Sequence, residues 1–267
     1  MIIVRTIAEL RRRLATAPAG STIGLVPTMG AFHAGHVALF RTARRECGSV
    51  VASLFVNPTQ FGDPTDLAAY PRDEARDARI AADEDIDMLF APPVEEIFPD
   101  GYGTWITVDG AGEGFEADFR PGHFRGVATV CAKLFTIVAP QVAYFGQKDA
   151  QQVAVVTQMA RDLNLPIAIR VVPTVRDADG LALSSRNVHL SPEDRQRALA
   201  IPQALTAGLA AARSGQDPVA AARAVLVGLE PDYVAVADFD GHPTLAIAAK
   251  VGRVRLIDNV QLTDDNR

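Results

Sequence analysis

The chain has 267 residues, of which 48% are hydrophobic and 22% charged, as is usual for a globular protein with one large domain or two unequal ones. Its net charge of -6 and its pI near 5.4 argue against a nucleic-acid partner, because nucleic-acid-binding domains usually carry a basic stripe. No segment approaches the roughly 18 consecutive apolar residues of a membrane helix, and the first residues lack the features of a secretory signal, so we expect a cytoplasmic protein with no membrane partner.

Strand-like and helix-like patterns alternate along the first 175 residues. We expect strands over residues 21–28, 49–57, 86–93, 141–146 and 166–175, and helices over 37–47, 72–84, 124–140 and 149–164. This alternation predicts a mostly parallel sheet with helices on both faces. The helices expected around residues 192–228 and the strands over 232–239 and 252–260 then predict a small C-terminal α/β domain, with the boundary after Val175.

The first stretch with chemical potential is VPTMGAFHAGH, residues 26–36, between an expected strand and an expected helix. Ligands bind at the carboxyl edge of parallel sheets, where Gly30 and Gly35 would let the backbone approach a phosphate. His33 and His36 could donate hydrogen bonds to phosphate oxygens beside the positive end of the helix. A zinc site is disfavoured because no third ligand is evident nearby. A turn with two solvated histidines is the alternative.

Amides and loop arginines mark two further stretches. Asn57 and Gln60 in FVNPTQFG, residues 55–62, could hold a carboxylate or hydroxyl without adding charge, although Asn-Pro is also a turn signal. In FRPGHFRGVATV, residues 119–130, Arg120 and Arg125 lie near His123. They could bind an anion, but loop arginines are more often solvated.

A lysine and a serine-rich loop complete the set. Lys148 is one of only three lysines among 26 basic residues. It follows Gly146 at the start of an expected helix, where it could meet a phosphate chain. In the first turn of that helix, either Gln151 or Gln152 could face the ligand. The spacing of a P-loop is absent. In GLALSSRN, residues 180–187, two hydroxyls and a guanidinium could clamp a triphosphate on a closing loop. Cys47 and Cys131 fall in apolar patterns and are expected to be buried thiols without a chemical role.

In this order and at these intervals, the five stretches resemble the pantothenate synthetase family, from about residue 22 to 190. PTMGAFHAGH is similar to its HIGH-type motif, which nucleotidyltransferases and class I aminoacyl-tRNA synthetases share in looser form, and LSSRN to its counterpart of the mobile KMSKS loop. The resemblance implies a Rossmann-like, mostly parallel domain over residues 1–175 that binds nucleotide and pantoate, a smaller C-terminal α/β domain over residues 176–267, and a homodimer.

The activity implied by the resemblance is condensation of (R)-pantoate with β-alanine, with ATP as co-substrate and Mg²⁺ as cofactor. The products would be pantothenate, AMP and pyrophosphate, formed through a pantoyl adenylate. The nucleotide-binding residues it implies are Met29, Gly30, Ala31, Phe32, His33, Ala34, Gly35, His36, Gly146, Gln147, Lys148, Asp149, Val175, Leu183, Ser184, Ser185 and Arg186. Of these, the implied catalytic residues are His36 as the proton donor, His33, Lys148, Ser184, Ser185 and Arg186.

The substrate residues implied by the resemblance are mostly amides. Gln60 would bind both pantoate and β-alanine, Gln152 would bind pantoate, and Asn57 would support the pocket. Phe61 and Val127 would be apolar neighbours of the pantoate methyl groups.

One position departs from the family pattern. Relatives often carry an acidic pair where this chain has Arg76 and Asp77, so Asp77 is a candidate Mg²⁺ ligand with less charge support. Two other functions stay open, a nucleotidyltransferase acting on a phosphate ester and a non-catalytic nucleotide-binding module.

Overall fold

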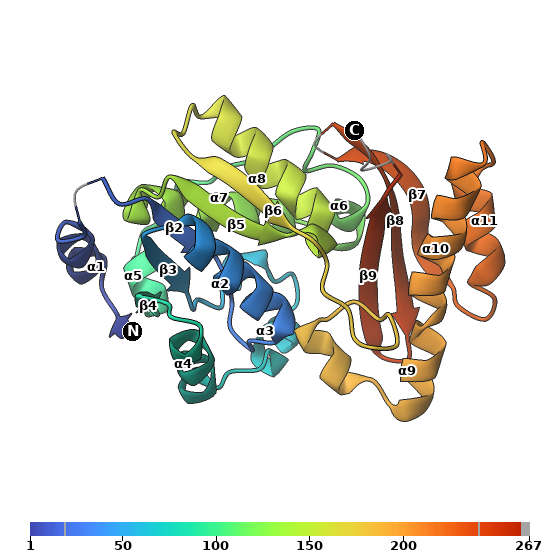
Figure 1. Cartoon of the computed structure of the whole chain (residues 1–267), viewed down its shortest axis with the longest axis horizontal. Helices are drawn as coiled ribbons and strands as arrows, with labels where there is room; N and C mark the ends of the chain where they lie inside the picture. The colour runs from blue at the N-terminus through green and yellow to red at the C-terminus, as the bar shows by residue number, and fades with distance from the viewer. Residues whose placement is uncertain (19, 240, 263–267) are drawn as a thin grey trace. The chain divides into compact units, whose positions relative to one another are not determined.

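A computed structural model describes residues 1–18, 20–239 and 241–262 (Figure 1). The chain divides into two compact units. The N-terminal unit comprises Met1–Gly146 and Gln151–Val172, and the C-terminal unit comprises Gln147–Ala150 and the residues from Pro173 onward.

The N-terminal unit is built on a six-stranded sheet in the order β1-β4-β3-β2-β5-β6, in which every pair of neighbours is parallel. Its strands are β1 (Ile2–Val4), β2 (Ile23–Val26), β3 (Ser49–Ser53), β4 (Met88–Phe90), β5 (Val142–Gly146) and β6 (Ala168–Val172). This confirms the parallel α/β sheet that the sequence predicts. The strands are shorter than expected, and β1 was not predicted.

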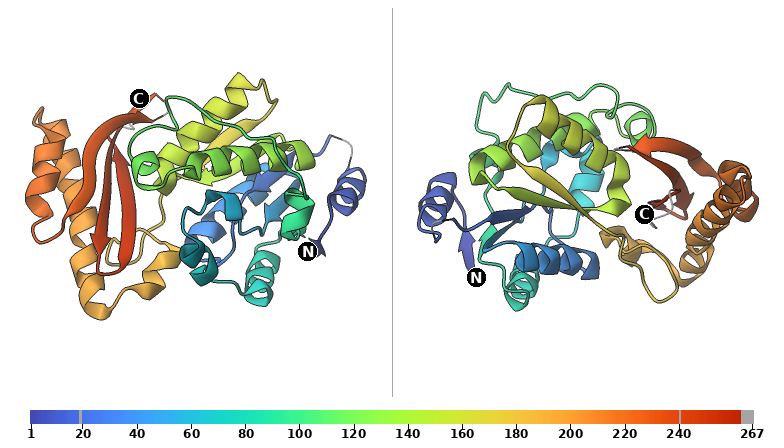
Figure 2. Two further views of the ribbon diagram at one scale, coloured as in Figure 1. Left: turned by 180° about the vertical axis from the view of Figure 1, so that it is seen from behind. Right: turned by 45° about the horizontal axis from the view of Figure 1, so that its top comes forward.

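Helices cover both faces of this sheet (Figure 2). The helices of this unit are α1 (Ile7–Leu14), α2 (Ala34–Glu46), α3 (Pro64–Ala69), α4 (Glu74–Asp83), α5 (Val94–Ile97), α6 (Glu116–Phe119), α7 (His123–Val138) and α8 (Ala150–Asp162), with the 3₁₀ turn η1 (Pro58–Gln60). The 3₁₀ turn η2 (Gln147–Asp149), between β5 and α8 in the chain, belongs to the C-terminal unit. Phe40 of α2 and Ala81 of α4 belong to the core on one face. Leu10 of α1, Phe135 of α7 and Met159 of α8 belong to the core on the other.

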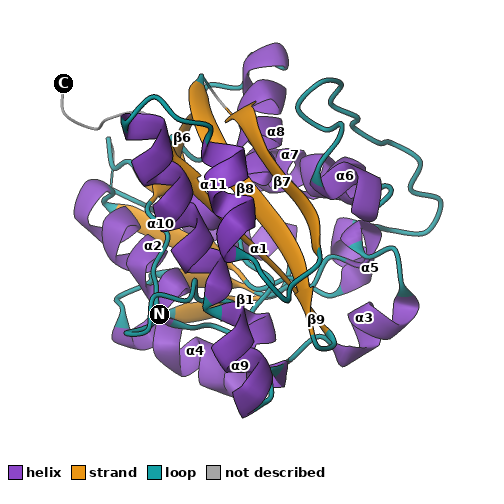
Figure 3. Cartoon of the chain, turned by 90° about the vertical axis from the view of Figure 1, so that its right-hand side faces the viewer, coloured by secondary structure: helices purple, strands orange, loops and turns teal. Residues whose placement is uncertain are grey.

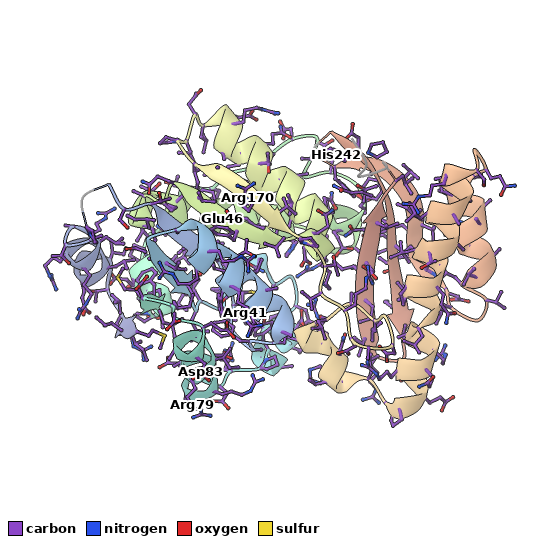
Figure 4. All side chains as sticks on the ribbon, in the orientation of Figure 1. Arg41, Glu46, Arg79, Asp83, Arg170 and His242 are labelled. Atoms are coloured by element: carbon purple, nitrogen blue, oxygen red, sulfur yellow. The ribbon has the colours of Figure 1, made fainter. Side chains whose placement is uncertain are left out.

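The end of α2 is fixed to the sheet by a polar network. Glu46 accepts hydrogen bonds from the Tyr144 hydroxyl and from Arg170 Nε, each at 3.1 Å, and Figure 4 labels Glu46 and Arg170 side by side. The buried Cys47 lies 3.1 Å from the same hydroxyl. Cys131 is also buried, so the expected buried free thiols are confirmed.

The strand order changes direction between β2 and β5. From β2 the chain passes through α2 to β3 on one side, whereas from β5 it passes through α8 to β6 on the other. The carboxyl ends of β2 and β5 therefore flank the topological switch point, which is where open α/β sheets bind ligands. Residues 27–36 follow β2 at this point, and Lys148 follows β5 there.

The C-terminal unit contains an antiparallel meander in the order β7-β8-β9 (Figure 3). Its elements are η3 (Ser185–His189), α9 (Pro192–Ala198), α10 (Ala200–Arg213), α11 (Pro218–Val225), β7 (Pro231–Phe239), β8 (His242–Val251) and β9 (Val254–Gln261). Ile201 and Leu205 of α10 pack on Leu245 and Ile247 of β8 in one core. The small α/β domain is confirmed, but β8 was not predicted.

Candidate active site

His33 and His36 lie at the amino end of α2 and bond to its first turn. His33 is the N-cap, and its Nδ1 accepts from the Gly35 N–H at 3.1 Å, while Nδ1 of His36 accepts from the His33 N–H at 3.3 Å. Each Nδ1 therefore carries no proton, so the neutral rings hold their proton on Nε2 and are donors there. The ring centroids are 4.3 Å apart. Two ring donors at a helix amino terminus are suited to an anion.

Asp77 of α4 holds the loop in front of these histidines. Its two carboxylate oxygens accept from the N–H groups of Ala31 and Phe32, each at 2.8 Å, and the residue is only 1% exposed. Ala31 has a φ of 53° and Gly30 a φ of 92°, so two consecutive residues occupy the left-handed region. A Cβ on Gly30 would lie 2.9 Å from an Asp77 oxygen, which is a steric reason for glycine there.

Asn57 and Gln60 follow β3, next to the carboxyl end of β2. Asn57 Nδ2 donates to Gln60 Oε1 at 3.0 Å and to the Gly126 carbonyl at 3.2 Å, while its Oδ1 accepts from the Thr59 N–H at 3.2 Å. The Asn57 amide thus bonds to neighbouring groups of the protein and orients Gln60. Because Gln60 Oε1 accepts, Gln60 offers its Nε2 as a donor for a ligand.

His123 and Gly126 of α7 fix the turn that carries Gln60. His123 Nδ1 lies 2.9 Å from the Gln60 carbonyl oxygen, which can only accept, so Nδ1 is protonated. His123 Nε2 lies 3.0 Å from Nη1 of Arg120, which can only donate, so the ring is neutral. A Cβ on Gly126 would meet the backbone of Thr59 and Gln60. The 119–130 stretch therefore supports the amide turn.

The two glutamines of α8 have different roles. Gln151 is 4% exposed, and its amide donates to the carbonyls of residues 111, 113 and 114 at 3.0 to 3.2 Å and accepts from the Glu116 N–H at 2.9 Å. Gln152 is half-buried, and its side chain makes no hydrogen bond with the described residues. Of the two, Gln152 is the one available to a ligand. Among the expected apolar neighbours, Val127 is buried in the core and Phe61 stacks edge-on against Tyr70 at 5.8 Å.

In the C-terminal unit, Lys148 lies in η2, directly after β5 and before α8. Its Nζ is 3.5 Å from Asp149 Oδ1, and its side chain is 19% exposed. No atom of the described residues would lie within 4 Å of a Cβ on Gly146, so the backbone is open there. The carbonyls of Gln147 and Lys148 accept from Asn259 Nδ2 at 2.9 and 2.8 Å.

The serine-rich stretch of this unit follows a hairpin-like loop. The Leu183 N–H donates to the Val175 carbonyl at 3.0 Å, so these two predicted residues lie together. Ser184 caps η3 by accepting from the Arg186 N–H at 3.3 Å. The loop is braced by Arg176 and Arg195, which form ion pairs with aspartates.

The residues that sequence reasoning missed are the ones that hold these segments. They are His123 and Gly126 in their supporting roles, and Asp258 and Asn259 of β9. The only signal for the last two was the polar pair in RLIDNV, where an apolar strand contains two adjacent polar residues. The described residues contain neither a group of three or more His, Cys, Asp or Glu that could hold a metal nor a helix long and apolar enough to cross a membrane.

Comparison with known proteins gives one consistent family. The family model for pantoate-beta-alanine ligase matches residues 2–261. The pantothenate synthetases of Moorella thermoacetica and Heliobacterium modesticaldum are each 49% identical to the chain. The first alignment covers 98% of this chain and 99% of the relative, and the second covers 90% and 92%.

Solved structures agree with this assignment. Pantothenate synthetase from Thermus thermophilus superposes with a TM-score of 0.92 at 44% identity, covering 98% of this chain and 99% of that one. Pantoate-beta-alanine ligase from Francisella tularensis, solved in complex with beta-gamma ATP and beta-alanine, gives a TM-score of 0.82 at 35% identity, covering 98% of both chains. The resemblance seen in the sequence is confirmed: the chain belongs to the pantoate-beta-alanine ligase family and is a ligase.

Proposed function

We propose that the chain condenses (R)-pantoate with β-alanine, using ATP, to give pantothenate, AMP and pyrophosphate through a pantoyl adenylate. The observation that carries this proposal is that two neutral imidazole donors follow β2 and an oriented, uncharged Gln60 amide follows β3, the neighbouring parallel strand. The relatives' names and the ATP and β-alanine in the Francisella tularensis complex support the same substrates.

In the first half-reaction, a pantoate carboxylate oxygen attacks the α-phosphorus of ATP. The bond to the bridging oxygen breaks, and pyrophosphate leaves with its electron pair. Gln60 Nε2 and Gln152 would hold pantoate, while Nε2–H of His33 and His36 would donate to oxygens on which negative charge grows. Lys148, Ser184, Ser185 and Arg186 would bind the departing phosphates.

In the second half-reaction, the amine of β-alanine attacks the acyl carbon of the adenylate. An amide bond forms, AMP leaves with the electrons of the mixed anhydride, and the nitrogen releases a proton. Gln60 would serve β-alanine as well as pantoate. No covalent bond to the protein forms in either step.

A resident Mg²⁺ on Asp77 fits this arrangement poorly. That carboxylate is 1% exposed and already holds the loop through both oxygens. A Mg²⁺ ion, which usually keeps several of its waters, could reach it only if the loop moved. We therefore propose that Mg²⁺ arrives with ATP as the counter-ion of the triphosphate, as part of the substrate.

The two other functions predict different substrates. A nucleotidyltransferase for a phosphate ester should have a more cationic substrate site than the amides Asn57, Gln60 and Gln152 provide. A binding module would retain ATP without releasing pyrophosphate. AMP formation that requires both pantoate and β-alanine, together with pyrophosphate–ATP exchange supported by pantoate alone, would establish the proposed reaction. Exchange that needs β-alanine would contradict the two-step order.

The donor role of His36 can be separated from its role in capping α2. In His36→Asn, a side-chain oxygen near the Nδ1 position can still accept from the His33 N–H, but the Nε2 donor is lost. We expect turnover to fall about 10²–10³-fold, as for loss of one oxyanion donor, with ATP binding changed much less. His242→Asn, at the exposed histidine labelled in Figure 4, is the matched control. Near-normal turnover of His36→Asn would exclude the donor role.

Two broader predictions belong to the same proposal. The family resemblance leads us to propose a homodimer, which light scattering of the purified chain would test. A cytoplasmic location is proposed on the same ground, and fractionation of cells producing the protein would test it.

A further inference from the structure

Two adjacent residues of β9 anchor the two segments of the C-terminal unit that the proposed function assigns to the nucleotide. Asn259 is the anchor of η2. Its Nδ2 donates to the carbonyls of Gln147 and Lys148 at 2.9 and 2.8 Å, and its Oδ1 accepts from Gln147 Nε2 at 3.3 Å. Both donors and the acceptor of the Asn259 amide are thus used on the segment that carries Lys148.

Asp258 is the anchor of the hairpin-like loop that leads into Ser184. Its Oδ2 accepts from Arg176 Nη1 at 2.6 Å, and its Oδ1 accepts from Arg176 Nη2 at 3.0 Å, a bidentate ion pair. Arg176 Nη1 also donates to the Gly180 carbonyl at 3.1 Å, and Arg176 pairs with Ala182 in an antiparallel bridge. The ion pair therefore spans the loop whose end is residues 183–186.

The strand geometry joins the two anchors rigidly. Successive side chains on a strand point to opposite faces, so Asp258 and Asn259 reach their partners from the two faces of β9. Asp258 lies opposite Ile247 and Asn259 opposite Ala246 in the pairing with β8. Asp258 Oδ1 also accepts from the Asn259 N–H at 2.8 Å. A shift of either segment thus acts on one of two adjacent, hydrogen-bonded residues of a single strand.

Stability alone gives a weak reason for this polar pair. Asp258 is 3% exposed and Asn259 is 5% exposed. A buried ion pair often contributes no more than well-packed apolar side chains of the same volume, because desolvation opposes the Coulomb attraction. What the pair provides that apolar residues cannot is directional bonding to specific carbonyl and guanidinium groups.

We propose that Asp258 and Asn259 are positioning residues for adenylate formation. They act through Arg176 and the η2 carbonyls to set the geometry in which Lys148 and residues 184–186 meet the triphosphate. This inference rests on the proposed function. It assigns them to the first half-reaction specifically, because the pyrophosphate leaves in that step and is absent from the attack of β-alanine on the adenylate.

The test compares two rates in the same variants of the full chain. Asn259→Asp keeps the size of the side chain but replaces the donor by an oxygen facing two carbonyls, and Asp258→Asn removes the charge that pairs with Arg176. We expect single-turnover adenylate formation to fall about 10–100-fold, in line with the cost of displacing reacting groups by about 1 Å. The attack of β-alanine on supplied pantoyl adenylate should stay within about threefold of wild type.

Matched controls make the same chemical changes elsewhere. Asp232→Asn breaks the ion pair with Arg255 in the same sheet, and Gln158→Glu alters an amide that donates to a backbone carbonyl of the N-terminal unit. Both should leave the two rates in the wild-type ratio. If Asp258→Asn fails to fold, Arg176→Gln breaks the same pair from its more exposed partner and must show the same selective loss.

The outcomes are distinct. Loss of the first rate alone supports positioning, and its partial recovery in Asp258→Glu, which restores the charge, supports it further. Equal loss of both rates, or loss of neither, overturns the inference while the proposed function stands. A wild-type chain that forms no adenylate from pantoate and ATP overturns the proposed function and the inference with it.

Discussion

Replacing Asp77 by Asn tests what this buried carboxylate does for the loop that carries His33 and His36. The substitution keeps the size of the side chain. It retains one oxygen acceptor but turns an amide donor toward one of the two N–H groups, those of Ala31 and Phe32, that now bond to the carboxylate. We expect the loop to leave its present conformation.

The magnitude follows from the bonds that are lost. Two hydrogen bonds to a charged acceptor contribute about 3–6 kcal/mol together, and the amide can restore one neutral bond of about 1 kcal/mol. Leaving the present conformation would also relieve a strain of about 1–2 kcal/mol that the wild type already bears at Ala31, whose φ of 53° lies in the left-handed region. The net loss exceeds the cost of a local rearrangement, so the loop should reorganise before the unit unfolds. We therefore expect a modest fall in Tm and a fall in kcat/KM of about 100-fold, because the histidines are displaced.

The assay is pantoate-dependent pyrophosphate–ATP exchange, measured across a range of free Mg²⁺ at saturating ATP. If Asp77 holds the loop, the variant stays slow at every Mg²⁺ concentration. Adding Ala31→Gly should recover part of the rate, because glycine adopts a positive φ without strain. Asp73→Asn, which alters the N-cap of the same helix α4, is the control. Recovery of the wild-type rate by high Mg²⁺ alone would refute the loop role and identify Asp77 as a metal ligand.

Three further outcomes follow from the same structure. Lys148→Ala and Lys148→Arg should both keep a Tm within about 2 °C of wild type, since among the described residues the ammonium has a single polar contact, at 3.5 Å with Asp149. Both should lose most single-turnover adenylate formation; a fully active Lys148→Arg would show that only charge is needed. Gly126→Ala should lower the free energy of unfolding by about 1–3 kcal/mol and raise KM for pantoate, because the new methyl group meets the backbone of Thr59 and Gln60. This steric cost should outweigh the gain of roughly 1 kcal/mol in helix propensity. An unchanged KM with normal melting would show that the turn moves to accommodate the methyl group. Burial raises the pKa of the Cys131 thiol to about 12, so this thiol keeps its proton in the folded state, whereas in the unfolded state it ionises above about pH 8.5. The free energy of unfolding should therefore fall by up to about 1.4 kcal/mol per pH unit from about pH 8.5 toward pH 12. Denaturant titrations of Cys131→Ala should lack this slope.

The parallel sheet could be predicted from the sequence because each buried strand is a short apolar run between helices with a clear amphipathic period. The misses have local causes. Strand β1, Ile2–Val4, has only three residues and shows no period. Strand β8 was missed because HPTLAIAAKV combines a proline with three alanines, which favour helix, and its strand form comes from pairing with β7 and β9 on both sides.

The candidate site was predictable to the extent that its residues are chemically conspicuous. Histidines at a helix start, a rare lysine and paired amides stand out in a single sequence. Their partners do not, because Asp77 meets its loop across 45 residues and Asn259 meets Lys148 across 111. A choice such as Gln151 against Gln152 depends on helix phase and on a loop fold that no local pattern encodes.

The two buried carboxylates that hold segments assigned to ATP, Asp77 and Asp258, share one physical feature. A carboxylate directed at a triphosphate would repel it, yet charge-assisted hydrogen bonds are the strongest means of ordering a loop. The Asp77 carboxylate accepts hydrogen bonds from two backbone N–H groups, and the Asp258 carboxylate forms an ion pair with Arg176. Each carboxylate thereby orders a loop, while the hydrogen-bond donors beside it offset its negative charge. Where no cation or N–H pair is present, as at the η2 carbonyls, the positioning group is the neutral amide of Asn259, which adds no negative charge near the proposed phosphates.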